Sequence, residues 1–128
     1  MKKIIIRVLL VLLVSYPILN STEMSGLLVD NLNAYVQFTP MMYYCVGMYV
    51  YAMNNNIQSL KIFSHITEKY KTSDYASKSQ YMIGKTYVRM QNKLKAREEF
   101  QKILEEYPDT YIIIKAKERL VELNRELR

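Results

Sequence analysis

Residues 81–108 read YMIGKTYVRMQNKLKAREEFQKILEEYP, and the stretch 37 residues earlier, 44–71, reads YCVGMYVYAMNNNIQSLKIFSHITEKYK. At this offset, residues 41–78 and 78–115 share nine identities over 38 pairs, several times what chance gives for such a composition. The identical pairs are Tyr44/Tyr81, Gly47/Gly84, Met53/Met90, Asn55/Asn92, Phe63/Phe100, Ile66/Ile103, Glu68/Glu105, Tyr70/Tyr107 and Lys78/Lys115. A period of roughly 20–50 residues is the signature of a repeat architecture. The chain therefore contains two copies of one structural unit.

The composition and the local sequence signals predict that each copy is a pair of helices. Three Gly and three Pro in 128 residues disfavour a turn-rich sandwich or barrel. Helices are expected over residues 41–53, 57–70, 74–90 and 94–107, with a last one from residue 111. The breaks between them fall at capping, turn-forming or helix-ending residues: Asn54-Asn55-Asn56, Thr72-Ser73, Gln91-Asn92-Lys93 and Pro108. The expected fold class is all-α.

Side chains three and four apart predict which side of each helix is buried. The stripes expected for the second helix of each copy are Ile57, Leu60, Phe63 and Ile66–Thr67, and Leu94, Arg97, Phe100, Ile103 and Leu104. The stripe expected for the last helix is Ile113, Ala116, Leu120, Leu123 and Leu127. Cys45, in an apolar helix, is expected to be buried. The adjacent pairs Glu98-Glu99 and Glu105-Glu106 are expected on a solvated face.

The second copy resembles the tetratricopeptide repeat. Gly84, Tyr87, Ala96, Phe100 and Pro108 stand at the spacings of that repeat's small, aromatic, small, aromatic and proline positions. A small residue lets two helices approach closely, an aromatic ring fills the space beside that contact, and proline ends the second helix. The first copy keeps Gly47 and Phe63 but has other residues at the remaining positions: Val50, Ser59 and Lys71.

The runs EEFQKILEEYPDT (98–110) and IKAKERLVEL (114–123) are similar to the variety of this repeat found in bacterial envelope proteins. Those proteins include the Tol-Pal-associated cell-division coordinator and the outer-membrane assembly lipoprotein. The resemblance implies a short right-handed array of helix-turn-helix units. Residues 24–39 would be a preceding helix, 40–73 the first repeat, 74–110 the second, and 111–128 a C-terminal capping helix.

Residues 1–23 have the layout of a targeting segment. Lys2, Lys3 and Arg7 make a basic start, residues 8–14 are an unbroken apolar run, and Pro17, Asn20 and Ser21 give a polar, turn-prone end. The apolar stretch 4–19 holds 16 residues, whereas a membrane-spanning helix needs about 20. We therefore expect a signal peptide or a retained N-terminal membrane anchor. Either way, the rest of the chain would be periplasmic or exported.

Charge is distributed unevenly along the remaining chain. Between residues 24 and 60 the only charged side chain is Asp30, whereas residues 61–128 carry 15 basic and 10 acidic side chains. From residue 24 onward the net charge is 15 − 11 = +4, with bases and acids interspersed. This balance argues against a nucleic-acid partner. The uncharged half carries more apolar surface than one side of a small domain can bury.

The sequence has no arrangement of residues that suggests catalysis or a cofactor. His65 is the only histidine, and no nucleophile or carboxylate is placed around it by sequence. One His and one Cys cannot make a four-ligand zinc site. No phosphate-binding loop or nucleophile motif occurs. We therefore predict a non-enzymatic protein without a metal or cofactor.

The resemblance implies that the first helices of the repeats line a concave groove. The positions that would face it are Met41, Tyr44, Met48 and Tyr51 in the first repeat, and Lys78, Tyr81, Lys85 and Arg89 in the second. Some of the first four could instead pack against residues 27–38, which have a helical spacing of apolar residues at Leu28, Leu32, Tyr35 and Val36. The groove and this cap remain alternatives.

The function expected is protein–protein interaction or scaffolding in the bacterial cell envelope, with a partner peptide or helix bound on the concave face. Tyr and Met side chains would take apolar groups, and the basic side chains would meet carboxylates. Self-association is the other form such binding could take. The alternative is a purely structural subunit of an oligomer or larger envelope complex, held by the uncharged residues 24–60.

Overall fold

The computed structural model describes residues 39–108 and 111–126, which form five helices. Their bounds are α3 Pro40–Ala52, α4 Asn56–Lys69, α5 Asp74–Arg89, α6 Lys93–Glu106 and α7 Ile112–Glu126. Each expected helix in this range is confirmed to within a residue or two. The targeting segment 1–23, the helix expected over 27–38 and the last stripe residue, Leu127, lie outside the described residues.

The two turns inside the repeats have the same construction. Asn54 and Gln91 each adopt a φ of 60°, in the left-handed region, which reverses the chain after the first helix. The next residue, Asn55 or Asn92, is the N-cap of the second helix, and its side chain accepts a hydrogen bond from the backbone N–H three residues on, of Gln58 at 3.3 Å or Lys95 at 3.1 Å. The repeat seen in the sequence is therefore also a repeat of backbone conformation.

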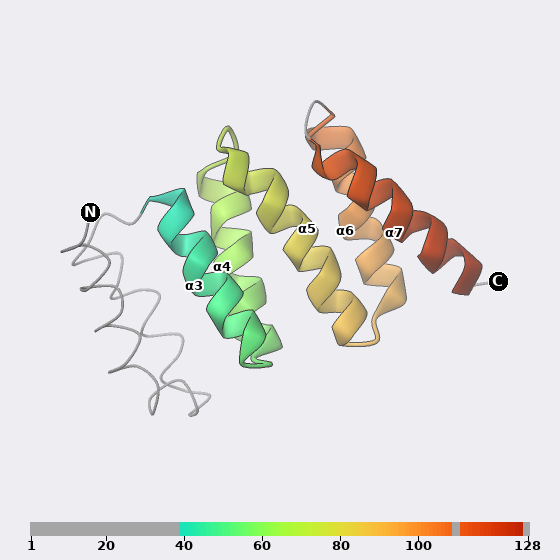
Figure 1. Cartoon of the computed structure of the whole chain (residues 1–128), viewed down its shortest axis with the longest axis horizontal. Helices are drawn as coiled ribbons and strands as arrows, with labels where there is room; N and C mark the ends of the chain where they lie inside the picture. The colour runs from blue at the N-terminus through green and yellow to red at the C-terminus, as the bar shows by residue number, and fades with distance from the viewer. Residues whose placement is uncertain (1–38, 109–110, 127–128) are drawn as a thin grey trace. The chain divides into compact units, whose positions relative to one another are not determined.

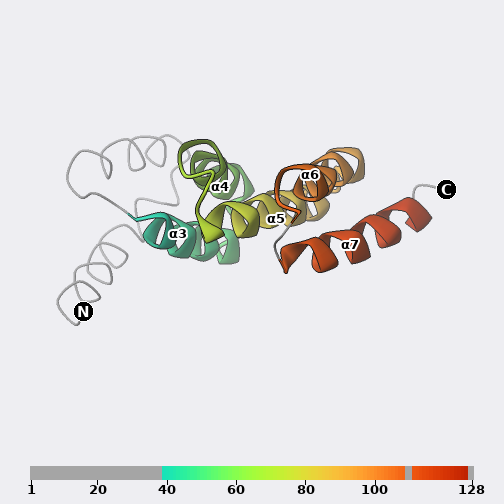
Figure 2. The ribbon, with the colours of Figure 1, turned by 90° about the horizontal axis from the view of Figure 1, so that it is seen from above.

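The helices stack side by side in chain order (Figure 1), and each helix packs against the next along the chain. Seen from above, α3, α5 and α7 make one layer and α4 and α6 the other (Figure 2). Helix α5 lies beside both α3 and α7, whereas among the described residues no Cα atom of α4 lies within 8 Å of one in α6. We call α3, α5 and α7 the inner layer and α4 and α6 the outer layer.

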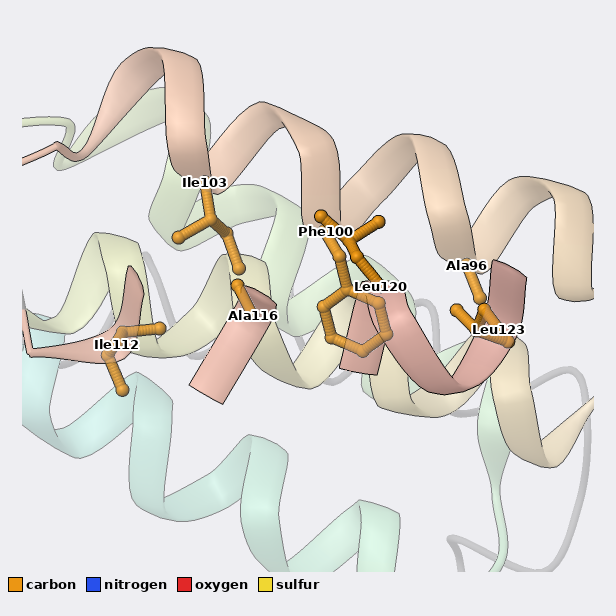
Figure 3. Packing of buried hydrophobic residues seen from close by; sticks show 7 residues of the cluster. All are labelled: Ala96, Phe100, Ile103, Ile112, Ala116, Leu120 and Leu123. Carbon is orange, nitrogen blue, oxygen red and sulfur yellow. The ribbon is translucent and has the colours of Figure 1, made fainter. Parts of the chain in front are cut away.

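A hydrophobic core cluster joins the second repeat to the last helix, between α6 and α7. It consists of Ala96, Phe100 and Ile103 from α6 and Ile112, Ala116, Leu120 and Leu123 from α7. Figure 3 shows the Phe100 ring beside Leu120, between the two helices. Phe63 and Phe100 are both completely buried. The expectation that an aromatic ring of each repeat fills the space between helices is thus confirmed for Phe63 and Phe100.

The stripes expected for the second helices are partly wrong. Ile57 and Leu94, expected to begin the buried stripes, are 62% and 61% exposed. Ser59 and Ala96 are buried instead, because the small position of the repeat is where the neighbouring helix comes close. Arg97 is exposed and Leu60 is half-buried. In the last helix the buried stripe begins at Ile112, not at Ile113, which is half-buried.

Glu99 is another correction, because it is buried and not solvated. Gln80 Nε2 of α5 donates a hydrogen bond to a Glu99 carboxylate oxygen at 2.7 Å and another to the Glu99 backbone carbonyl at 3.2 Å. Lys102 Nζ lies 3.0 Å from both carboxylate oxygens. A buried carboxylate needs such partners to offset its loss of hydration. The two bonds from Gln80 therefore join α5 to α6 at a buried position.

Candidate functional site

The eight residues expected to line a groove all lie on the inner layer, four on α3 and four on α5. On α3, Met41 and Met48 are exposed, by 55% and 37%. Tyr44 and Tyr51 are half-buried, as are Lys78, Tyr81, Lys85 and Arg89. None of the eight is fully buried, so each presents part of its side chain at the surface.

Tyr44 is a point where the two repeats meet. Its ring centroid lies 5.8 Å from that of Phe63 in its own repeat and 5.4 Å from that of Tyr75 at the start of α5. Burial raises the pKa of the Tyr44 hydroxyl, and electrostatic interactions with Tyr111, Cys45 and Tyr75 raise it further. Tyr44 of α3, Tyr75 of α5 and Tyr111, the residue before α7, therefore lie near one another.

Tyr51 and Arg89 hold the other end of the first repeat to the second. The guanidinium carbon of Arg89 lies 3.5 Å from the centroid of the Tyr51 ring, a stacked cation–π contact. Arg89 Nη1 donates to the Tyr51 backbone carbonyl at 2.8 Å, and Nε donates to Asn56 Oδ1 at 2.7 Å. These two residues, expected only to bind a partner, thus also join α5 to α3 and α4.

Lysines lie beside tyrosine rings along the same layer. Lys78 Nζ is 4.7 Å from the centroid of Tyr75, Lys85 Nζ is 5.6 Å from that of Tyr51, and Lys115 Nζ is 5.5 Å from that of Tyr111. None of these three ammonium groups has an ion pair among the described residues. The inner layer therefore carries basic groups that are available to an acidic partner.

Tyr81 is anchored within the second repeat. Its ring centroid lies 5.4 Å from that of Phe100. A side-chain hydrogen bond with Tyr81, and a second with Glu122, raise the pKa of Arg119 on α7. Arg119 Nη1 donates to Glu122 Oε2 at 2.7 Å. Tyr81 thus connects α5 to both α6 and α7.

Sequence reasoning missed three residues of this layer: Tyr75, Tyr111 and Lys115. The signal for Lys115 was present, because Lys115 stands 37 residues after Lys78 and α7 repeats the first helix of a unit. Cys45 was predicted wrongly, since it is exposed on α3. Its position in the helix places it opposite the residues that α3 buries, Tyr43, Gly47 and Val50.

The other surface features of the described residues do not include the residues expected to bind a partner. A cleft of about 330 Å³ between α6 and α7 is lined by Arg97, Glu98, Gln101, Leu120 and Asn124, and contains none of the expected site residues. No group of three or more His, Cys, Asp or Glu in residues 39–108 and 111–126 could hold a metal ion. Within the same residues, every helix is too short or too polar to cross a membrane.

A family model for the tetratricopeptide repeat matches residues 78–110, which take in most of α5, all of α6 and the turn that follows. No curated protein matches the chain. The matched range contains the glycine, alanine and phenylalanine that bring α5 and α6 together, and α3 and α4 repeat the same contact. The chain is therefore a tetratricopeptide-like helical-repeat protein, of a kind that typically binds other proteins.

Proposed function

We propose that this protein is a non-enzymatic binding or scaffolding module that holds a peptide or helix of a partner protein on its inner layer. The observation that carries this proposal is the composition of one face. Met41 and Met48 are exposed on α3, and Lys78 and Lys85, whose ammonium groups have no ion pair with any described residue, follow on α5. Flexible methionines adapt to varied apolar side chains, and an apolar patch on a surface marks an interface.

The charge of the inner layer indicates what the partner carries. Helix α3 has no charged residue, whereas α5 presents Lys78 and Lys85 and α7 presents Lys115. A partner segment with apolar side chains at one end and carboxylates at the other would complement this surface. The contacts of Tyr51 with Arg89 and of Tyr44 with Tyr75 hold the helices in place beforehand, so little conformational entropy is lost on binding.

We place this activity in the bacterial cell envelope. The support is the basic and apolar layout of residues 1–23, together with the resemblance of 98–123 to envelope repeats. Fusing residues 1–26 to a reporter that is active only outside the cytoplasm should give signal. Retention of the reporter in the cytoplasm would contradict the location and leave the binding proposal untouched.

The exposed side chains of α3 also favour a second candidate function, that of a structural subunit in an oligomer or larger complex. Met41, Cys45 and Met48 are exposed together on one helix, and Met53 is 49% exposed at its end. A permanent interface would bury this surface in every molecule. Light scattering during size-exclusion chromatography separates the two functions: a stable oligomer at all concentrations favours the subunit, and a monomer favours the transient binder.

Site-specific photo-crosslinking in cells tests the proposed function. A photoreactive side chain is placed at Met48 or Lys85 on the inner layer, and at Ile57 or Leu94 on the outer layer as matched exposed controls. We expect one discrete adduct from the inner-layer positions that is absent from the outer-layer positions. Adducts of the same mass from both layers, or from the outer layer alone, would contradict the proposal.

A further inference from the structure

Four exposed residues of α3 form one stripe along the helix. They are Met41, Cys45, Met48 and Ala52, and we call them the α3 stripe. Their spacings of four, three and four place them on one side of the helix, opposite Tyr43, Gly47 and Val50, which α3 buries. Methionine and alanine are apolar, and a free cysteine behaves as a small apolar residue. The stripe is therefore apolar throughout, on a helix that has no charged residue.

The repeat shows what the equivalent side of the other inner-layer helices carries. On α7, 74 residues after the stripe, the positions are charged and exposed: Lys115, Arg119, Glu122 and Glu126. On α5, 37 residues after the stripe, three of the four positions are basic: Lys78, Met82, Lys85 and Arg89. This side is thus wholly apolar only on α3. A continuous apolar surface beside charged equivalents marks an interaction site.

The sizes of the four side chains make the α3 stripe complementary to itself. Large and small residues alternate along it, in the order Met, Cys, Met, Ala. In an antiparallel pair with a two-fold axis between positions 46 and 47, Met41 faces Ala52 of a second copy, and Met48 faces its Cys45. Each large residue then meets a small one, which lets two helices interdigitate. A parallel pair would place methionine against methionine and cysteine against cysteine.

We propose that the α3 stripe is the contact surface of a symmetric homodimer, in which it packs antiparallel on the same stripe of a second copy. The pairing brings no like charges together, because α3 has none. A two-fold interface, with the same patch on both copies, is the commonest form of protein oligomer. Four residues from each copy are far fewer than the roughly 20–30 per side of a standard interface. We therefore expect the dimer to dissociate on dilution.

The dimer rests on the proposed function, in that a second copy becomes an occupant of the exposed methionines on the inner layer. Lys78 and Lys85 lie on α5, outside the stripe, and are left for an acidic partner. The dimer and the partner binding can therefore fail separately. A photo-crosslinked adduct at Lys85 in cells reports the partner, and crosslinking between the stripes of the purified protein reports the dimer.

Thiol crosslinking between two differently tagged copies of the full chain, purified in detergent, tests the pairing. Both copies carry Cys45→Ser, and one also carries Met41→Cys, the other Ala52→Cys. Antiparallel pairing puts these two thiols opposite each other, whereas two Met41→Cys sites would lie about 16 Å apart along the helix axis. A short bismaleimide should therefore link mostly unlike copies, whereas random collision links like and unlike copies equally. Ile57→Cys and Leu94→Cys, at exposed outer-layer positions, are the matched controls and should give only background.

Equal linking of like and unlike copies, or linking no greater than in the controls, overturns the proposal. Preferential linking of two Met41→Cys copies would show parallel pairing and overturns it as well.

A charge in the stripe gives an independent measurement. Met48→Glu would bring two carboxylates into the centre of the interface, so this variant should stay monomeric in light scattering at concentrations where the unmodified chain dimerises. Ile57→Glu is the matched control and should dimerise as the unmodified chain does. Circular dichroism checks that both variants keep their helices. If Met48→Glu dimerises as well, the proposal is wrong, and if it fails to fold, the crosslinking result decides alone.

Discussion

Gly84 of α5 and Phe100 of α6 approach so closely that a side-chain carbon on the glycine would stand 2.6 Å from Cε1 of the ring. Gly47 and Phe63 repeat this relationship in the first unit at the same distance. Both rings are completely buried. The glycines are therefore required for space, since neither has a positive φ, and the pair of helices in each unit is built around this contact.

Gly84→Ala should destabilise the protein, although alanine is the better helix former by about 1 kcal/mol. The added methyl group meets a ring that is enclosed on all sides, and such overpacking costs about 1–3 kcal/mol. Urea unfolding measures the change. Phe100→Leu provides room for the methyl group, so the double variant should lose less than the sum of the two single variants. A stabilising Gly84→Ala would contradict the close contact.

Replacing the exposed apolar residues of the second helices should have little effect. Ile57→Ala and Leu94→Ala remove side chains that are 62% and 61% exposed, so each should change stability by less than about 0.5 kcal/mol. Phe63→Ala and Phe100→Ala, at fully buried sites, should each cost about 3–5 kcal/mol. Thermal melts of the four variants test this. A large loss for Ile57→Ala or Leu94→Ala would mean that a further element covers the outer layer.

Arg89→Lys should weaken the joint between the repeats. Lysine cannot stack on the Tyr51 ring while also donating to the Tyr51 carbonyl and to Asn56, as the guanidinium does. We expect a loss of about 1–2 kcal/mol in the free energy of unfolding. Lys85→Arg is the matched control, because Lys85 lies beside the same ring with no such hydrogen bonds, and it should be nearly neutral. Similar losses in both variants would contradict the role of Arg89.

Stability should fall as the pH rises above about 10, the ordinary tyrosine pKa. Burial raises the pKa of Tyr43, Tyr44 and Tyr107 in the folded protein. Above the unfolded pKa, the unfolded chain loses these protons first, so the folded state holds more protons and each further rise in pH favours unfolding. The contribution is present below the unfolded pKa and is lost as the pH rises through the folded values.

Chemical denaturation at a series of alkaline pH values measures this effect. The variants Tyr43→Phe, Tyr44→Phe and Tyr107→Phe separate it from the titration of lysines, which occurs in the same range. Each variant should flatten the alkaline decline. If stability declines with pH in all three variants as steeply as in the unmodified protein, the decline comes from the titration of lysines.

The sequence predicted those structural features that depend on the properties of one residue at its own position in the chain. The turns at Asn55 and Asn92 and the close approach at Gly47 and Gly84 were predicted because asparagine favours turns and glycine has no side chain. The identical spacing of both sets made the repeat visible before any contact was known. The match of a family model to residues 78–110 confirms that reading for the second copy.

The errors arose where burial depends on a distant residue. Ile57 and Leu94 are more apolar than Ser59 and Ala96, yet the smaller residues are the buried ones. Only a small side chain fits where two helices come close together. Glu99 is buried because Gln80, 19 residues earlier, donates to it. Of the site residues, all eight lie on one layer, but the structural contacts of Tyr51, Tyr81 and Arg89 come from partners on other helices.

The eight methionines supply the most direct test of partner binding on the inner layer. With the partner segment identified by photo-crosslinking, methyl NMR spectra of the methionine-labelled protein are recorded during its titration. We predict shifts at Met41 and Met48, and none at Met53 and Met90, which are 49% and 42% exposed at the turns. Lys85→Glu should weaken the binding of an acidic segment while leaving the unbound spectrum unchanged. Shifts at Met53 and Met90 without shifts at Met41 and Met48 would place the partner elsewhere and contradict the account.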